Sequence, residues 1–376
     1  MKPDQGPQRR AGLSVVLLAA LLAAGYGATE RRAFAQSEVS AESRRVRVDS
    51  RPDRVALEQS VARALEYLRR EHSKSGDEYR GFLRSPFPVA TTSLAGLAIL
   101  ASGVLPGEGE HGDQLVGCVN FILEVARRDA FLTEADGDDQ SGSRMHGHCY
   151  AVLFLTQVAG SLPAQREAQV SSVIRSGIRV IQNAQSRDGG WYYWAKNSSD
   201  EDEASVTICA LQALRAARDA GYLVDSARID SAIRYVKRCQ NADGSVRYQL
   251  RGGPQRSTFA LTAAAVSTLN AAGVYRSDEL SRGLDFLKKE LRAAGSNPLL
   301  AVVDTYFYYG NFYTAQALWQ ERGSEWDAWY AEARTRLQRR QKRDGNWESP
   351  FGDVYATAMS LLILQMPVGY LPMFER

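Results

Sequence analysis

Six stretches of the chain are almost continuously apolar and rich in alanine, and each follows a more polar, amphipathic stretch. In the amphipathic stretches apolar residues recur at steps of three and four, as in 174–185 and 227–240, which predicts helices with one buried face. The apolar stretches predict helices buried on both faces. They comprise residues 91–104, 147–160, 204–217, 257–273, 311–320 and 354–366. Strand signals are sparse, so the pattern predicts an all-α protein built from helix pairs.

A short motif, Gln-x-x-Asp-Gly, marks three of the connections between these stretches. It begins at Gln185, Gln240 and Gln341, and a Trp stands at the same offset in two copies, as Trp191 and Trp347. The three Gln residues are separated by 55 and 101 positions, so the second gap is close to twice the first. This spacing is typical of an internal repeat with one unrecognised copy in the longer gap.

The same period extends over most of the chain. It predicts degenerate copies near Glu71, Ala126 and Glu290, each after an amphipathic stretch. Six helix pairs result, and six pairs can close into a ring with the amphipathic helices outside and the apolar helices inside. We therefore predict an all-α, (α/α)6 toroid, with an open solenoid as the alternative.

The repeated Q-x-x-D-G-x-W motif resembles the repeat of squalene–hopene-type terpenoid cyclases and of protein prenyltransferase β subunits. The resemblance covers about residues 55–370 and implies an (α/α)6 toroid in which the motifs are structural. The residues themselves agree, because Asp at a turn binds backbone N–H groups, Gly accepts a positive φ, and Trp stacks on Gln and staples outer helices. The structural residues are Gln185, Asp188, Gly189, Trp191, Gln240, Asp243, Gly244, Gln341, Asp344, Gly345 and Trp347.

A second regularity appears when the six apolar stretches are aligned on a common Leu. The residue seven positions before that Leu is polar in every stretch. These residues are Ser93, His148, Thr207, Thr262, Asn311 and Thr357. They form either a polar ring near one end of the barrel or a set of groups that satisfy free backbone N–H groups.

The N-terminal segment has the features of an export signal. Arg9 and Arg10 precede an apolar run at 13–24, and small residues at 33–35 precede Gln36. We predict a cleaved signal peptide at 1–35, a linker at 36–54 and the toroid at 55–376, in a periplasmic or extracellular protein. The alternative is an uncleaved membrane anchor, and membrane contact is otherwise expected only through a lipid ligand.

Export changes how the charge of the 376-residue chain is interpreted. Five of the 46 Lys and Arg residues and two of the 43 Asp and Glu residues lie in 1–35, so the remainder carries equal numbers of both. Without an excess of positive charge outside residues 1–35, the protein has no electrostatic attraction for nucleic acid, and a nucleic-acid partner is not expected. The four Cys residues form no C-x-x-C pair and are predicted to be small buried core residues.

The segment "DGDD" contains the candidate catalytic residues Asp136, Asp138 and Asp139. It matches the D-x-D-D acid motif of class II terpenoid cyclases, where crowded carboxylates keep one Asp protonated so that it can protonate an alkene or epoxide. The resemblance implies the same role here. The surrounding Gly- and Ser-rich sequence also fits a solvated turn or an incidental cation site.

Six further residues are candidates for lining a central cavity. They are His148, Asp304, Tyr306, Tyr309, Tyr313 and Asp353. The three tyrosines fall at steps of three and four and so share one helix face, where they would stabilise a carbocation, stack on sugars, or simply pack in the core. The D-x-C ligand spacing of prenyltransferase zinc sites is missing from the sequence, and we expect neither a metal nor another cofactor.

Three functions fit this sequence. The first is a cyclase-like protein whose cavity binds an apolar, isoprenoid-type small molecule, as an isomerase-like or prenyltransferase-like enzyme or as a binder. The second is a non-catalytic scaffold for unknown protein partners. The third is a secreted polysaccharide lyase or hydrolase, which paired carboxylates such as Asp304 and Asp353 would favour.

Overall fold

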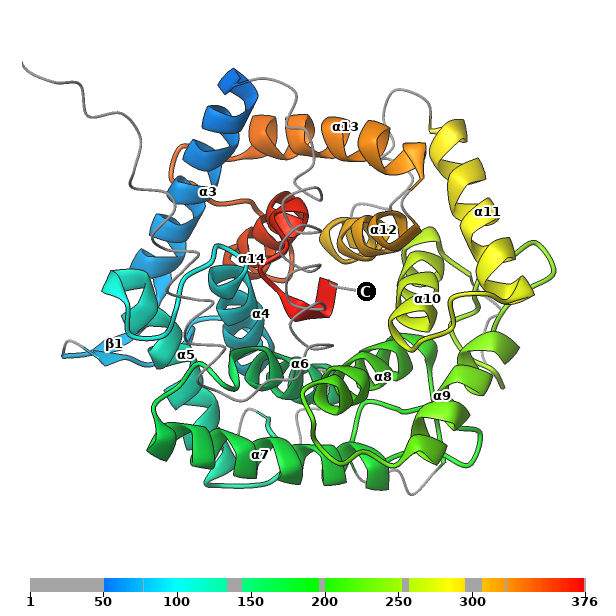
Figure 1. Ribbon diagram of the computed structural model, residues 1–376, viewed down its shortest axis with the longest axis horizontal. Helices are drawn as coiled ribbons and strands as arrows, with labels where there is room; N and C mark the ends of the chain where they lie inside the picture. Colours follow the sequence, from blue (N-terminus) through cyan, green and yellow to red (C-terminus); the bar gives the residue numbers. More distant parts are fainter. Residues whose placement is uncertain are drawn as a thin grey trace, which may run out of the picture. The chain divides into compact units, whose positions relative to one another are not determined.

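The computed structural model describes residues 51–76, 78–133, 144–195, 200–251, 257–294, 306–321 and 323–374. The chain divides into the units Met1–Val48 and Asp49–Arg376, and the described residues all belong to the second. Within them, twelve α-helices form two concentric rings (Figure 1). The outer ring consists of α3 (Arg51–Glu71), α5 (Gly109–Ala126), α7 (Ala164–Asn183), α9 (Ser226–Arg238), α11 (Asp278–Ala293) and α13 (Ser324–Arg340).

The inner ring consists of α4 (Pro88–Leu100), α6 (Arg144–Val158), α8 (Ala204–Asp219), α10 (Phe259–Ala271), α12 (Phe307–Glu321) and α14 (Asp353–Gln365). Each inner helix packs against its two ring neighbours, and α14 packs against α4, which closes the ring. Short additions are the paired strands β1 (Lys74–Ser75) and β2 (Glu78–Tyr79) and the 3-10 turns η3 (Met366–Val368) and η4 (Pro372–Phe374). The predicted all-α toroid of six helix pairs is confirmed.

The two rings differ as the sequence pattern predicts. The inner helices α4, α6, α10 and α14 are buried over nearly their whole length and have no polar face, whereas α9 and α11 bury only one stripe. All four Cys residues are buried and free. None of the helices in the described ranges is both long enough and apolar enough to cross a membrane.

The Gln of each motif connects neighbouring outer helices. Gln185 Nε2 donates to Gly189 O within its own turn and to Arg228 O on α9, both at 2.9 Å. Gln240 makes the same pair of bonds, to Gly244 O and to Glu279 O on α11. The last copy, Gln341, binds Gly345 O and Ser60 O on α3, so that it joins the final outer helix to the first.

The Gly of each motif has two reasons to be Gly. Gly189, Gly244 and Gly345 have φ values of 97°, 90° and 95°, in the region that disfavours side chains. A Cβ on Gly189 would also lie 2.4 Å from the Ser231 carbonyl oxygen of α9. The next outer helix therefore approaches the turn too closely for any side chain at this position.

The Trp residues act differently from the sequence prediction, whereas Asp243 acts as predicted. Trp191 Nε1 donates to Ile181 O at 2.6 Å, so Trp anchors the turn to its own outer helix, while Gln reaches the neighbouring one. Trp347 repeats this bond with Leu337 O at 2.8 Å. Asp243 accepts from the backbone N–H of Ser245 at 3.0 Å, as predicted for a turn Asp.

The other two motif Asp residues behave in their own ways. Asp188 forms ion pairs with Arg238 and Arg251 rather than binding a turn N–H in the contacts described. The backbone carbonyl of Asp344 accepts from Arg70 Nη2 at 2.7 Å. The Gln and Gly contacts are therefore the same in all three copies of the motif. The partner of the Asp side chain differs from copy to copy, depending on which charged residues lie nearby.

The aligned polar residues hold the turns onto the inner helices. Thr207 Oγ1 accepts from Trp191 N at 3.0 Å and donates to Glu203 O at 2.6 Å in the preceding turn of its own helix. Thr262 and Thr357 accept in the same way from Val246 N and Trp347 N. These threonines therefore satisfy free backbone N–H groups and do not form a polar ring that faces the cavity. The N–H groups belong to the turns that precede the inner helices.

Candidate functional site

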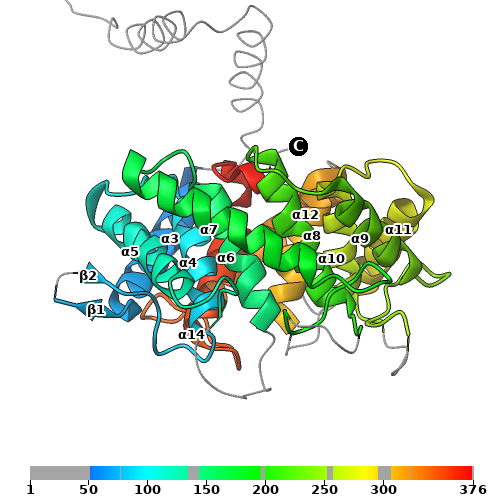
Figure 2. The ribbon, with the colours of Figure 1, turned by 90° about the horizontal axis from the view of Figure 1, so that it is seen from below.

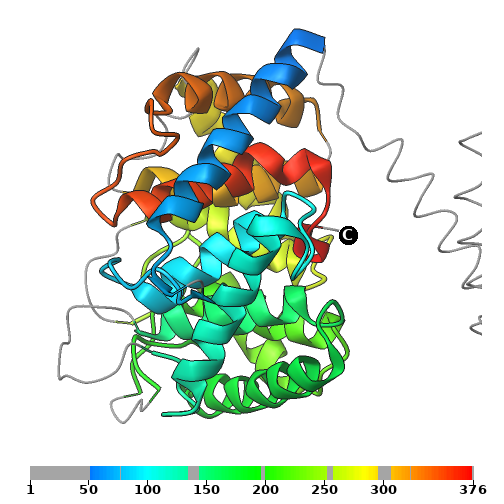
Figure 3. The same ribbon diagram turned by 90° about the vertical axis from the view of Figure 1, so that its left-hand side faces the viewer.

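One end of the inner barrel is closed by the last residues of the described chain. The segment 366–374 lies across this end in the views of Figures 2 and 3, where it is drawn in red. Met373 N donates to Gln157 Oε1 on α6 at 2.8 Å, and Trp319 Nε1 on α12 donates to Phe374 O at 3.2 Å. Because α6 and α12 stand on opposite sides of the ring, the segment bridges the barrel end.

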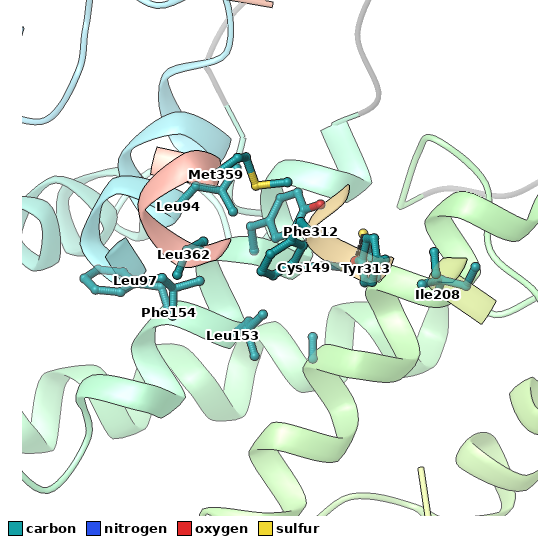
Figure 4. Close-up of a cluster of buried hydrophobic side chains, with 14 of the residues drawn as sticks. Leu94, Leu97, Cys149, Leu153, Phe154, Ile208, Phe312, Tyr313, Met359 and Leu362 are labelled. Atoms are coloured by element: carbon teal, nitrogen blue, oxygen red, sulfur yellow. Dashed lines mark hydrogen bonds between the residues drawn. The ribbon is translucent and has the colours of Figure 1, made fainter. Parts of the chain in front are cut away.

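Side chains fill the middle of the barrel. Figure 4 shows buried apolar groups from α4, α6, α8, α12 and α14 converging around Phe312 and Met359. A polar bridge lies beside them, since Tyr313 OH donates to Gln212 Oε1 at 3.1 Å and Gln212 Nε2 donates to Gln316 Oε1 at 3.0 Å. This bridge connects α8 with α12, which are not neighbours in the ring. We call the remaining end of the barrel, where the inner helices begin, the barrel mouth.

The barrel mouth is lined by residues offset from the turn-binding Thr positions. Residues two positions before and two positions after a turn-binding residue lie on the opposite face of its helix, which is the inward face, one helical turn apart. In α6, α8, α10, α12 and α14 the outermost layer consists of His146, Ser205, Ala260, Tyr309 and Tyr355. The layer below consists of Tyr150, Cys209, Ala264, Tyr313 and Met359.

Four residues of these two layers are tyrosines, and they come from α6, α12 and α14. The rings of Tyr309 and Tyr313 lie 4.8 Å apart in an edge-to-face arrangement, and Tyr313 OH lies 3.8 Å from Cys209 Sγ. Burial raises the pKa of Tyr150 and Tyr309 well above the usual value, with a smaller contribution from the nearby Cys209. The Tyr309 hydroxyl is buried and has no hydrogen-bond partner within the described part of the chain.

Glu203 is the fully buried carboxyl group beside this cluster. It caps α8 by accepting from Ser205 N at 2.8 Å and Val206 N at 2.6 Å, and it also accepts from Ser205 Oγ. Burial raises the pKa of Glu203 to about 7, although its hydrogen bonds with Ser205, Val206 and Tyr248 act in the opposite direction. The group therefore titrates near neutral pH.

Two histidines near the mouth have different environments. His146 Nε2 lies 3.3 Å from Ser205 Oγ, and burial lowers the pKa of His146 to about 4, so the ring is neutral. His148 faces away from the mouth, because its Nδ1 accepts from Leu132 N at 2.9 Å and its Nε2 lies 3.1 Å from Gly177 O of α7. It holds a turn as Thr207 does, which differs from the cavity-lining position predicted for it.

The other candidate residues are distributed as follows. Tyr313 is fully buried and Tyr309 is partly buried on α12, and Tyr306 is 50% exposed just before it. Asp353 lines a small pocket beside the mouth. Asp136, Asp138, Asp139 and Asp304 lie outside the described residues. Among the residues that are described, no group of three or more His, Cys, Asp and Glu side chains could hold a metal ion.

Sequence reasoning missed four residues of the mouth: Tyr150, Glu203, Cys209 and Tyr355. The missing step was a shift of two residues from the aligned polar positions, which identifies Tyr150, Cys209 and Tyr355 at once. No repeat pointed to Glu203, because the residue before each inner helix differs from unit to unit.

Comparisons with known proteins agree with this architecture. Residues 154–301 match the family model described as the squalene-hopene cyclase C-terminal domain. This range includes two of the three Gln-x-x-Asp-Gly motifs. This part of the α/α toroid is therefore similar to the squalene-hopene cyclase C-terminal domain. A comparison with curated protein sequences finds no match.

Solved structures with the same toroid include enzymes of two chemistries. An inactive variant of the GH76A α-1,6-mannanase from Salegentibacter sp. HEL1_6, in complex with α-1,6-mannotriose, has a TM-score of 0.60 and 8% identity over 84% of this chain and 99% of that one. The type II terpene cyclase MstE from Scytonema has a TM-score of 0.55 and 14% identity over 84% and 99%. At such identities the likeness establishes the shared toroid, and the chemistry must be argued from the site.

Proposed function

We propose that the barrel mouth of this squalene-cyclase-like toroid binds an apolar, isoprenoid-type small molecule. The observation that carries this proposal is the tyrosine cluster of α6, α12 and α14, in which Tyr150, Tyr309 and Tyr355 surround the buried Cys209. Aromatic ring faces bind hydrocarbon and attract developing positive charge. A bound prenyl chain would contact these rings, and an allylic or tertiary cation would be stabilised by them.

The charge state of the mouth supports an apolar ligand. Burial raises the pKa of the Cys209 thiol to about 12, so it is protonated and uncharged at neutral pH. The ring of His146 is neutral as well. The oxygens of Glu203 are occupied by hydrogen bonds that cap α8. A charged ligand would thus find no ionised partner in Cys209 or His146, and the Glu203 oxygens are already bonded within the chain.

A solved structure with this fold gives the proposal a precedent. A variant of the type II terpene cyclase MstE from Scytonema was solved in complex with geranylgeranyl dihydroxybenzoate, its substrate, and has a TM-score of 0.52 and 13% identity to this chain. If this chain also catalyses a cyclisation, we propose Asp136, Asp138 and Asp139 as the proton source, with Asp138 as the residue to replace first.

Binding is tested by native mass spectrometry and calorimetry with geranylgeraniol on the complete protein. We expect a complex of one ligand per chain, and Tyr309→Ala to weaken it about tenfold or more because an aromatic contact is lost. Tyr275→Ala is the matched control, since Tyr275 is 62% exposed on the surface. Equal weakening in both variants, or no complex in the wild type, would refute the proposal. Asp138→Asn then separates turnover from binding.

A polysaccharide-active enzyme is the second candidate. Tyr306 is half exposed, and Arg144 lies 5.2 Å above the Trp194 ring, so aromatic groups accessible to a sugar occur at the same end. Glycoside hydrolysis needs two carboxyl groups, and Asp304 and Asp353 are the sequence candidates for them. Binding and cleavage of α-1,6-mannotriose test this candidate, and turnover of the sugar without geranylgeraniol binding would favour it over the first.

We also propose that residues 1–35 direct export. The basic and apolar runs and the small residues before Gln36 support a cleaved signal peptide. The intact mass of the protein isolated after expression with its own N-terminus tests this directly. A chain that begins at Gln36 fits cleavage, whereas a full-length chain in the membrane fraction fits an anchor.

A further inference from the structure

A small pocket with both charged and apolar lining residues lies between the C-terminal end of α3 and the start of α14. Its volume is about 200 Å³, and its lining includes Tyr67, Glu71, Phe82, Arg84 and Asp353. Pockets for drug-sized ligands span roughly 300–1,000 Å³, so a metabolite-sized or fragment-sized molecule fits here.

Tyr67 contributes a largely buried side chain to the lining of the pocket. Tyr67 is only 9% exposed, and its hydroxyl makes no hydrogen bond with any other described residue. Burial raises the pKa of Tyr67 well above its usual value, and the charges of Glu71 and Asp353 are the next contributions. Both carboxylates therefore lie near this hydroxyl, which is available to hydrogen-bond to a molecule in the pocket.

The carboxylates lack cationic partners. Neither Glu71 nor Asp353 forms an ion pair within the described ranges, and the bond that Asp353 receives is from Asn346 Nδ2 at 3.0 Å. Arg84 is exposed and is likewise outside every ion pair described. Two carboxylates and one guanidinium leave the pocket with one net negative charge, while Phe82 gives it an apolar wall that is 1% exposed.

We propose that this pocket is a binding site for a small molecule that carries a protonated amine on a compact apolar body. The ammonium group would donate to Glu71 and Asp353, neutralise their mutual repulsion, and place its body against Phe82. The Tyr67 hydroxyl would hydrogen-bond to a second polar group on the ligand. A neutral sugar would use the hydroxyl but would leave the negative charge uncompensated, so the amine is the better fit.

The test compares two probes of the same shape, benzylamine and benzyl alcohol, by calorimetry on the complete protein. We expect benzylamine to bind about tenfold more tightly, because a hydrogen bond between an ammonium group and a carboxylate is stronger than one between neutral groups. Asp353→Asn and Glu71→Gln should each weaken benzylamine binding and leave benzyl alcohol unchanged. Asp113→Asn, at an exposed position on α5, is the control and should change neither.

A variant that should strengthen binding serves as a control for damage to the fold. Arg84→Glu removes the positive charge at an exposed position and should tighten benzylamine binding, which a destabilised pocket would not do. Equal affinity for the two probes, or amine binding unaffected by all three pocket variants, overturns the proposal. D-mannose binding that is lost in Tyr67→Phe, without any preference for the amine, would overturn it in favour of a sugar subsite. Geranylgeraniol binding at the barrel mouth is measured separately, so either proposal can fail alone.

Discussion

The outward and inward sides of the same inner helices contrast sharply. On the outward side, Thr207 and Thr262 accept the same kind of hydrogen bond from their turns, each at 3.0 Å. Two residues earlier, on the inward side, the corresponding residues are Ser205 and Ala260, and Tyr355 occupies that position on α14. One side repeats and the other varies within a single helical turn.

The difference separates what the fold requires from what a ligand would require. Each turn presents the same backbone N–H at the same place, so the outward acceptor is fixed by geometry in every unit that keeps the turn. The inward side meets side chains from the other helices, and no two units meet the same set. Inward-facing residues that differ from unit to unit, such as the tyrosines of α12, therefore indicate where a ligand would bind.

The largest expected loss of stability comes from a substitution on the outward, repeated side of the structure. Trp191 is fully buried, and Trp191→Ala should lower the free energy of unfolding by about 3–5 kcal/mol through cavity formation and loss of its bond to Ile181 O. Urea denaturation measures the loss. The control is Trp194→Ala, three residues along and only partly buried, for which we expect a much smaller change. Similar losses in the two variants would contradict an anchoring role for Trp191.

Glu203 links the two sides, and its titration should be visible in stability. Its backbone N–H donates to Trp191 O, while its side chain hydrogen-bonds with Tyr248. The folded pKa of about 7 exceeds the ordinary value of 4.5, so the folded state holds more protons between them. The free energy of unfolding should therefore fall as pH rises from about 4.5 to 7, by about 3 kcal/mol, and level off above.

Glu203→Gln isolates this contribution. Chemical denaturation of the variant at several pH values should lack the decline that Glu203 causes in the wild type. Glu58→Gln, at an exposed ion pair with Arg54, serves as the control and should retain it. A decline of equal size in the Glu203 variant would show that other groups cause it.

Gln341→Ala sharpens the comparison by opening the outer ring at one contact. The variant loses the bonds from Nε2 to Ser60 O and Gly345 O, both at 2.9 Å, and should be destabilised by about 1–3 kcal/mol. Thermal and urea unfolding measure this. Gln182→Ala also removes a contact between outer helices, to the exposed Asp225 N–H, and should cost less. A greater loss of stability in the Gln182 variant would contradict the view that Gln341 is the more important contact between outer helices.

The smallest expected effect on stability lies on the inward side. Tyr309→Phe removes a buried hydroxyl that has no partner in the described residues, so the free energy of unfolding should change by about 0.5 kcal/mol or less. Tyr313→Phe is its counterpart and should cost about 1 kcal/mol, because it loses the bond to Gln212. A large loss at Tyr309 would mean that its hydroxyl holds the fold together.

The sequence was sufficient for the toroid because its information is repeated. A six-fold period, three copies of one motif and alternating helix types all require the same helix-pair unit, and the closed ring of α4 to α14 follows. Even the degenerate units obey the pattern, since Phe82 N donates to Thr92 Oγ1 and Leu132 N donates to His148 Nδ1. The motif turn thus survives where its Gln and Trp are missing.

The site was less predictable for a physical reason. The inner helices are apolar on both faces, so periodicity identifies a row of equivalent residues without indicating which row faces the axis. His148 was for this reason expected to line the cavity, whereas it binds Gly177 O of an outer helix. Tyr309 and Tyr313 were found because aromatic residues cluster there, and Asp136, Asp138 and Asp139 remain a prediction from their motif.

The bond between Gln341 and Ser60 has a consequence for solubility. A linear array of repeats exposes an apolar edge at each end and needs capping repeats with polar faces. This ring has no such ends, because the first and last helix pairs cover each other. Opening that seam would uncover the facing sides of α4 and α14, two adhesive surfaces on one molecule, and chains opened in this way would be prone to assemble head to tail.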